Sequence, residues 1–169
     1  TRTDSSAASD VYKRQSQAVA RYLTRIHKYM EDEDWINAKR ELEVTARRYF
    51  KNEDSYERAL INQLYGQFYA LQRDYKNAIP WFEKAIAKGR LPFAADLQVS
   101  YSLAQCYFQT GRYKDVIATL ENYRDKASKR GQNMAPIQLM LLGIAYYQEQ
   151  DTFNACLLYT SDAADESVR

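Results

Sequence analysis

Two residue types in this sequence commonly do chemistry, and neither has the partners that such chemistry needs. His27 is the only histidine, so a zinc site would lack the other ligands that such sites use. Cys106 follows Gln105 in a helical pattern, where we expect it to be buried between helices. A cysteine nucleophile needs a base nearby, and His27 lies far from it along the chain. We therefore expect no catalytic residue, no metal site, no cofactor and no enzyme activity.

Two runs of charge also have a simpler explanation than a site. EDED (31–34) lacks the glycine and the distant glutamate of an EF-hand loop, so we expect a turn between two helices. DKASKRG (125–131) could contact phosphate, but a helix end near its C-terminal dipole is the favoured interpretation. The chain has 24 Lys+Arg and 22 Asp+Glu, with the signs interspersed. A net charge of +2 produces no strong field to gather nucleic acid or anionic lipid.

The two ends of the sequence differ from the chain between them and match each other as DNA. With suitable codons, SSAASDVYKRQ (5–15) is the reverse complement of a stretch that encodes CLLYTSDAADE (156–166) in another frame. This segment resembles the adapter of a transposase-based sequencing library. We therefore treat residues 1–15 and 156–169 as adapter-derived, non-native scars. Residues 16–155 are then the natural domain, expected to be part of a longer gene product.

A pattern of two helices joined by a short turn occurs four times between these ends. Each copy has an apolar helical pattern, a short polar turn and a second helical pattern, over 22–46, 62–89, 100–123 and 139–155. Equivalent small positions are separated by 40, 38 and 39 residues; they are Ala38, Ala78, Val116 and Ala155. We expect Asp34 and Asp74 to cap second helices, and Gly111 to supply a left-handed residue in its turn.

These copies resemble the tetratricopeptide repeat (TPR), which places small, aromatic and alanine residues at set positions across about 34 residues. The signature positions in the second, third and fourth copies hold Gly66, Tyr69, Ala78, Phe82, Ala85, Ala104, Tyr107, Gly143 and Tyr146. The first copy is degenerate. The resemblance covers 16–155 and implies an all-α fold, a right-handed α-solenoid of antiparallel helix hairpins with about 3.5 repeats.

The small positions predict where paired helices approach each other. Glycine inside a helix costs about 0.5–1 kcal/mol relative to alanine, and close packing can return more. We expect Gly66, Ala104 and Gly143 to leave this gap for the second helix of each hairpin. We expect Phe82, Leu120 and the signature tyrosines to fill the space between successive hairpins. Apolar residues of the incomplete fourth hairpin would lack a cover, which the segment 156–159 could supply by continuing a helix.

The resemblance also implies that the first helix of each hairpin lines a concave groove. By register, the groove positions are Leu23, His27, Met30, Gln63, Gln67, Leu71, Gln98, Tyr101, Gln105, Phe108, Gln109, Met140, Ile144, Tyr147 and Gln148. The middle of this surface is glutamine and aromatic without charge, which suits an extended peptide or a partner helix. It lacks the Lys, Asn and Arg with which some TPR domains hold a chaperone's C-terminal carboxylate. The alternative is that these residues are ordinary helix surface.

The expected function is therefore a non-enzymatic scaffold for another protein or peptide, with no small-molecule substrate and no membrane span. Residues 57–123 resemble TPR proteins found with bacterial Ton energy-transduction genes, which implies a periplasmic location; otherwise a cytoplasmic one is expected. Two alternatives stay open. One is a helical repeat that binds single-stranded RNA, as pentatricopeptide arrays do. The other is a regulatory domain of a larger, truncated enzyme.

Overall fold

The computed structural model describes residues 20–49, 55–151, 154–156 and 158, and its regular elements in these ranges are all helices. A first helix covers 20–31, and residues 154–156 and 158 are helical again near the end. Between them lie α2 (Trp35–Tyr49), α3 (Tyr56–Leu71), α4 (Tyr75–Ile86), α5 (Phe93–Gln109), α6 (Tyr113–Ser128) and α7 (Pro136–Gln148). The predicted all-α fold is confirmed. The two ends interpreted as adapter-derived, 1–15 and 156–169, fall outside the described residues, except at Cys156 and Leu158.

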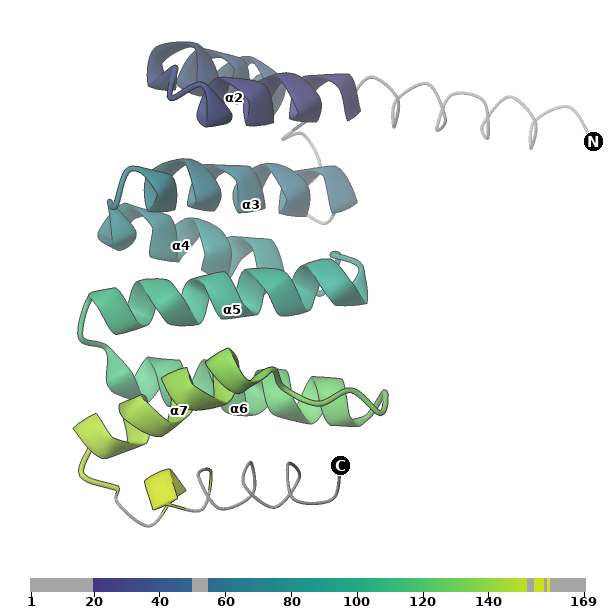
Figure 1. Ribbon diagram of the computed structural model, residues 1–169. Coiled ribbons are helices and arrows are strands. Elements are labelled where there is room, and N and C mark those ends of the chain that lie inside the picture. Colours follow the sequence, from purple (N-terminus) through teal and green to yellow (C-terminus); the bar gives the residue numbers. More distant parts are fainter. Residues whose placement is uncertain (1–19, 50–54, 152–153, 157, 159–169) are drawn as a thin grey trace, which may run out of the picture.

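The helices form antiparallel hairpins that stack in chain order, as Figure 1 shows. The hairpins are 20–31 with α2, α3 with α4, and α5 with α6, followed by α7. In the view of Figure 1, α3 and α5 lie in front of α4 and α6, so the first helices share one side of the stack. Each hairpin buries its apolar face against its neighbours, which is the arrangement of an α-solenoid.

The turns inside the hairpins repeat one backbone conformation. Each turn has a residue with positive φ at the same position of the repeat: Glu33 (55°), Arg73 (60°), Gly111 (72°) and Gln150 (63°). The prediction for Gly111 is confirmed. The other three positions hold residues with a Cβ, for which this left-handed conformation costs about 1–2 kcal/mol.

An Asp–Asn pair begins the second helix after three of these turns. Asp34 Oδ1 accepts from the backbone N–H of Asn37 at 3.1 Å, and Asp74 Oδ1 accepts from that of Asn77 at 3.3 Å. Both predicted caps are confirmed, and Asp151 makes the same contact in the fourth hairpin. In each pair the asparagine amide also donates to the second carboxylate oxygen. The hydrogen bond from the Asn37 side chain is the main cause that lowers the pKa of Asp34.

Gly66 lies at a close approach of the two helices of its hairpin, as the sequence predicted, and its partner there is an aromatic ring. A Cβ added at Gly66 would lie 2.5–2.8 Å from Cδ1, Cε1 and Cγ of Phe82. Phe82 therefore packs into the gap of its own hairpin. Its expected position was the space between successive hairpins. Ala104, at the equivalent position of α5, is fully buried.

The fourth hairpin is described only in part. Gly143 is buried in α7, but no described atom would lie within 4 Å of a Cβ there. The helix expected to pack against it lies mostly outside the described residues, so that prediction stays a prediction. Leu158 packs against the core cluster that contains Leu142, as expected for a segment that covers this face. Leu157 and Tyr159 lie outside the described residues.

Candidate binding groove

A hollow of about 690 Å³ opens on the first-helix side of the first three hairpins. Its lining residues are His27, Met30, Glu31, Glu33, Trp35, Gln67, Ala70, Leu71, Tyr75, Phe82, Ser102, Gln105, Cys106 and Gln109. We call this hollow the groove. Three consecutive hairpins contribute to it, so the stacking of repeats creates the groove and no single hairpin could form it.

Some of the predicted groove residues line the groove, and others do not. Those that line it are His27, Met30, Gln67, Leu71, Gln105 and Gln109. Other predicted residues lie elsewhere on the same helices: Leu23 on the first, Gln63 on α3, and Gln98, Tyr101 and Phe108 on α5. The positions on α7 lie outside the lining; Met140, Tyr147 and Gln148 are exposed and Ile144 is half-buried.

Several lining residues were not among the predicted groove positions. Trp35 and Tyr75 are the first residues of α2 and α4, and they reach the groove from the turns. Phe82 comes from the second helix of its hairpin, and its ring lies over Gly66. Because Gly66 has no side chain, the ring of Phe82, from the second helix of the hairpin, can form part of the groove wall. The shared position of Trp35 and Tyr75 in the repeat was the available signal.

Two glutamines of α3 have amide oxygens buried without a hydrogen bond. Oε1 of Gln63 and Oε1 of Gln67 accept no hydrogen bond from any described residue. A buried polar atom without a partner costs about 1–3 kcal/mol, so a donor that reaches it would gain correspondingly. Gln67 lines the groove, so its side chain borders the space that a ligand would occupy.

Cys106 is buried in the groove wall, as predicted, with 2% of its surface exposed. Burial raises the pKa of its thiol to about 11. The thiol therefore stays protonated near neutral pH, and a protonated thiol is a poor nucleophile and a poor metal ligand. In the described ranges, no group of three or more His, Cys, Asp or Glu side chains could hold a metal ion.

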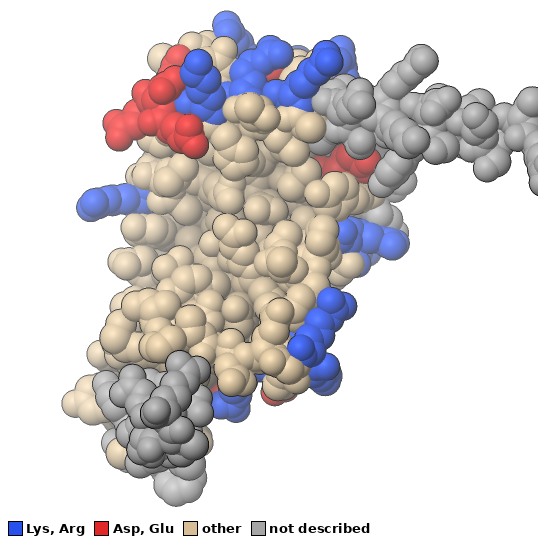
Figure 2. All heavy atoms as spheres, turned by 45° about the vertical axis from the view of Figure 1, so that its right-hand side comes forward, with Lys and Arg blue, Asp and Glu red and all other residues tan. Residues whose placement is uncertain are grey.

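Charge lies at one end of the groove. Among the described residues of the lining, Glu31 and Glu33, from the first hairpin, are the only acidic ones, and none is Lys or Arg. Neither glutamate was among the predicted groove positions. On the face in Figure 2, the largest acidic patch lies at the upper left, beside basic side chains along the top, whereas the middle holds neither sign of charge.

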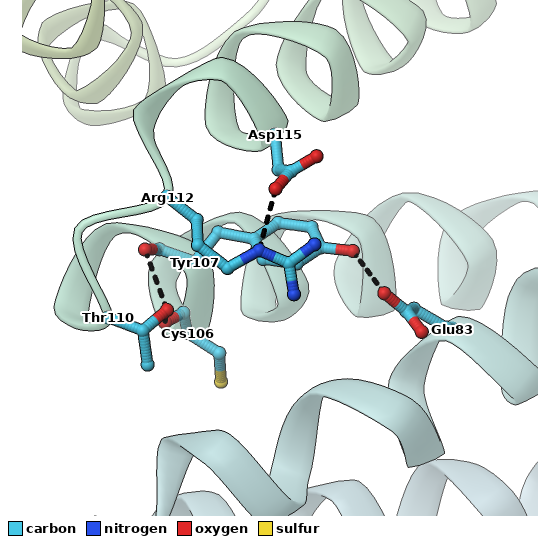
Figure 3. Close-up of polar contacts among 6 residues, drawn as sticks. All are labelled: Glu83, Cys106, Tyr107, Thr110, Arg112 and Asp115. Carbon is cyan, nitrogen blue, oxygen red and sulfur yellow. Dashed lines mark hydrogen bonds and ion pairs between the residues drawn. The ribbon is translucent and has the colours of Figure 1, made fainter.

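The junction between the second and third hairpins is polar (Figure 3). The Tyr107 hydroxyl donates to Glu83 Oε1 at 2.5 Å, which joins α5 to α4 of the preceding hairpin. Arg112 lies over the Tyr107 ring, 4.5 Å from its centroid, and its Nε is 2.6 Å from Asp115 Oδ2. Burial and then the bond to Glu83 raise the pKa of Tyr107 above its ordinary value.

The next junction repeats this link. The Tyr146 hydroxyl donates to Glu121 Oε1 at 2.9 Å. Burial, then this hydrogen bond, raises the pKa of Tyr146 to about 12. The expected position of Tyr107 and Tyr146 between hairpins is confirmed, whereas their glutamate partners were not predicted. Glu83 and Glu121 each follow a buried core residue, Phe82 or Leu120, and that spacing was the available signal.

The basic cluster at 125–131 is partly committed to its own hairpin. Lys126 Nζ lies 2.7 Å from Oδ2 of Asp96, a buried carboxylate of α5. The Arg130 guanidinium lies over the Phe93 ring, 4.1 Å from its centroid. These contacts support a structural role for two of its cations. Across the described part of the chain, no helix combines the length and the apolar character that crossing a membrane requires.

Stacked antiparallel hairpins with one turn conformation and repeated small and tyrosine positions define a TPR-like α-solenoid. Residues 71–134 match the model of a family described as anaphase-promoting complex, cyclosome, subunit 3. The chain is also similar to a crystal structure from Podosopora anserina that carries a kinesin light chain designation and nearly identical TPR-like repeats. That similarity has a TM-score of 0.71 and 18% identity, over 89% of this chain and 75% of the other. No curated protein matches the sequence. The predicted fold class is thereby confirmed.

Proposed function

We propose that the protein is a non-enzymatic interaction scaffold that binds a segment of another polypeptide in the groove. The observation that carries this proposal is the groove itself, about 690 Å³ across three hairpins, with a wall of glutamine, aromatic and aliphatic side chains. Glutamine offers a donor and an acceptor to a peptide backbone, and Leu71, Trp35 and Tyr75 offer apolar contact. TPR-like repeats generally mediate such interactions.

A nucleic acid fits the same surface poorly. Phosphate recognition depends on Lys and Arg, whose counterion release supplies most of the affinity. The described part of the groove lining contains no Lys or Arg, while Glu31 and Glu33 would repel a phosphate backbone. The RNA-binding alternative therefore has no support from the groove.

A pair of matched variants tests this proposal. Leu71 is 58% exposed and lines the groove, whereas Ile36 is 83% exposed and does not. We expect the wild type to retain a subset of an immobilised library of acetylated, amidated dodecapeptides. Leu71→Asp should bind that subset at least about tenfold more weakly, because a carboxylate would be desolvated under the ligand. Ile36→Asp adds the same charge outside the groove and should leave binding unchanged. Equal retention by all three proteins contradicts the proposal.

A narrower form of the proposal assigns the scaffold to the periplasm, beside the Ton energy-transduction machinery. Its support is the sequence resemblance of residues 57–123 alone. The test is the intact gene: a secretion signal upstream and Ton genes beside it are expected. A gene without either contradicts the narrower form and leaves the groove proposal intact.

A further inference from the structure

We propose that the groove recognises a polypeptide segment with a lysine or arginine at one end, held by Glu31 and Glu33 beside Trp35. The inference rests on the proposed function and specifies the chemistry of its ligand. The partner segment has one basic side chain at the first hairpin, and uncharged side chains over the second and third hairpins.

The first support for this proposal is the charge of two carboxylates at the end of the groove. Glu31 ends the first helix and Glu33 lies in the turn, and both are exposed. Neither forms an ion pair with a described residue. Asp34, in the same acidic run, is committed to capping α2 through Asn37. Two carboxylates at the groove end are therefore available to an external cation.

The second support is the set of residues at the equivalent positions of the other hairpins. Glu31 corresponds in the repeat to Leu71 and Gln109, and these two also line the groove. One row along the groove thus has a carboxylate in the first hairpin, an aliphatic side chain in the second and an amide in the third. A ligand that follows this row meets charge at one end only, so charge complementarity sets its direction as well as its composition.

Trp35 adds an aromatic surface at the same end. It is half-buried, lines the groove, and is held by an edge contact with Phe68, with ring centroids 6.0 Å apart. A cation beside carboxylates and an indole gains from both ion pairing and the ring quadrupole. Lys and Arg also carry apolar stems, which can lie along Met30 while the charged group reaches the carboxylates.

The test is a double-mutant cycle on peptides from the dodecapeptide library. The tightest basic peptide is compared with a copy in which norleucine replaces its lysine, which removes the charge and keeps the stem. Both are titrated by fluorescence anisotropy against the wild type and against Glu31→Gln/Glu33→Gln. We expect about tenfold weaker binding when either partner loses its charge, no further loss when both do, and a smaller effect at high salt.

Asp32→Asn is the matched control, because Asp32 belongs to the same acidic run and does not line the groove. It should keep the preference for lysine. Glu33→Gln suits the turn, since Gln150 adopts the equivalent left-handed conformation. Binding that depends on Leu71 but shows no basic preference, or a preference unchanged in Glu31→Gln/Glu33→Gln, overturns this inference alone. A library in which no peptide depends on Leu71 overturns the proposed function as well.

Discussion

The second and third hairpins have the same backbone plan, but different interactions hold each one together. In the α3–α4 hairpin the central contact is one of shape, because the Phe82 ring fills the space above Gly66. Its turn contains a strained residue, Arg73, with φ of 60°. Asp74 then caps α4 through Asn77. The interactions are local, and most are visible in the sequence signature.

The α5–α6 hairpin has Ala104 where the second has Gly66, and its turn is relaxed by Gly111, with φ of 72°. Its N-cap position holds Arg112, which pairs with Asp115 and lies over Tyr107. An Arg–Asp pair takes the place of the aspartate cap, whereas Ala104 and Leu120 still pack in the apolar core. One solenoid geometry thus accepts a tight ring-over-glycine contact in one hairpin and added charged contacts in the next.

Removing the shape contact should have the largest effect. Gly66→Leu places a large side chain where even a Cβ would lie 2.5 Å from the Phe82 ring. We expect the free energy of unfolding to fall by about 1–3 kcal/mol, measured by urea denaturation. Combining Gly66→Ala with Phe82→Leu should lose less stability than the two single changes summed, because the smaller side chain makes room. Strict additivity would contradict a direct contact between the two positions.

The stability of the α5–α6 hairpin should depend instead on Lys126. Lys126→Met leaves the buried carboxylate of Asp96 without its ion pair. We expect a loss of about 1–2 kcal/mol in the same assay, since the carboxylate stays partly solvated. Lys114→Met is the control on the same helix, because Lys114 is 86% exposed and lies 4.0 Å from Glu149. Its effect should be near zero. Equal losses in both variants would contradict a special role for the buried pair.

The sequence predicted what depends on local chemistry and on register. Asp34, Asp74 and Gly111 act within their own turns, so their types were sufficient evidence. Register also placed Gln67 and Gln105 on the groove side. It could not show where that side is hollow, because the depth depends on side chains such as Trp35 and Phe82, which come from second helices.

The long-range polar contacts of the third hairpin were beyond sequence reasoning for a related reason. Lys126 and Asp96 are separated by 30 residues, and Tyr107 and Glu83 by 24. Helical periodicity places each side chain on a face but does not set the distance between faces of different helices. The pairing of α5 with α6 brings Lys126 to Asp96, and the stacking of α5 on α4 brings Tyr107 to Glu83.

The link between the two hairpins should contribute less than either internal contact. Tyr107→Phe removes the hydrogen bond to Glu83 and keeps the ring under Arg112. We expect a loss of about 1 kcal/mol at neutral pH. A loss equal to that of Tyr107→Ala would show that the ring contributes nothing, contrary to its burial.

The tyrosine links also predict how stability depends on alkaline pH. The pKa of Tyr146 is raised from 10.0 to about 12, so the folded state keeps a proton that the unfolded state loses. Its contribution is complete below pH 10 and is lost as the pH rises towards 12. The free energy of unfolding should fall less steeply across this window in Tyr146→Phe than in the wild type. Parallel curves would contradict the raised pKa of Tyr146.

The smallest expected effect comes from exchanging the turn residues, and it has opposite signs in the two hairpins. Arg73→Gly should stabilise the second hairpin, because glycine adopts φ of 60° without the steric cost that arginine has there. Part of this gain is offset by the greater entropy of glycine in the unfolded chain, which leaves a net of about 0.5 kcal/mol. Gly111→Arg should destabilise the third hairpin by a similar amount. No atom lies within 4 Å of a Cβ at Gly111 among the described residues, so a clash would not add to the cost. Thermal unfolding of the two variants measures the strain, and shifts of the same sign would contradict this account of the turns.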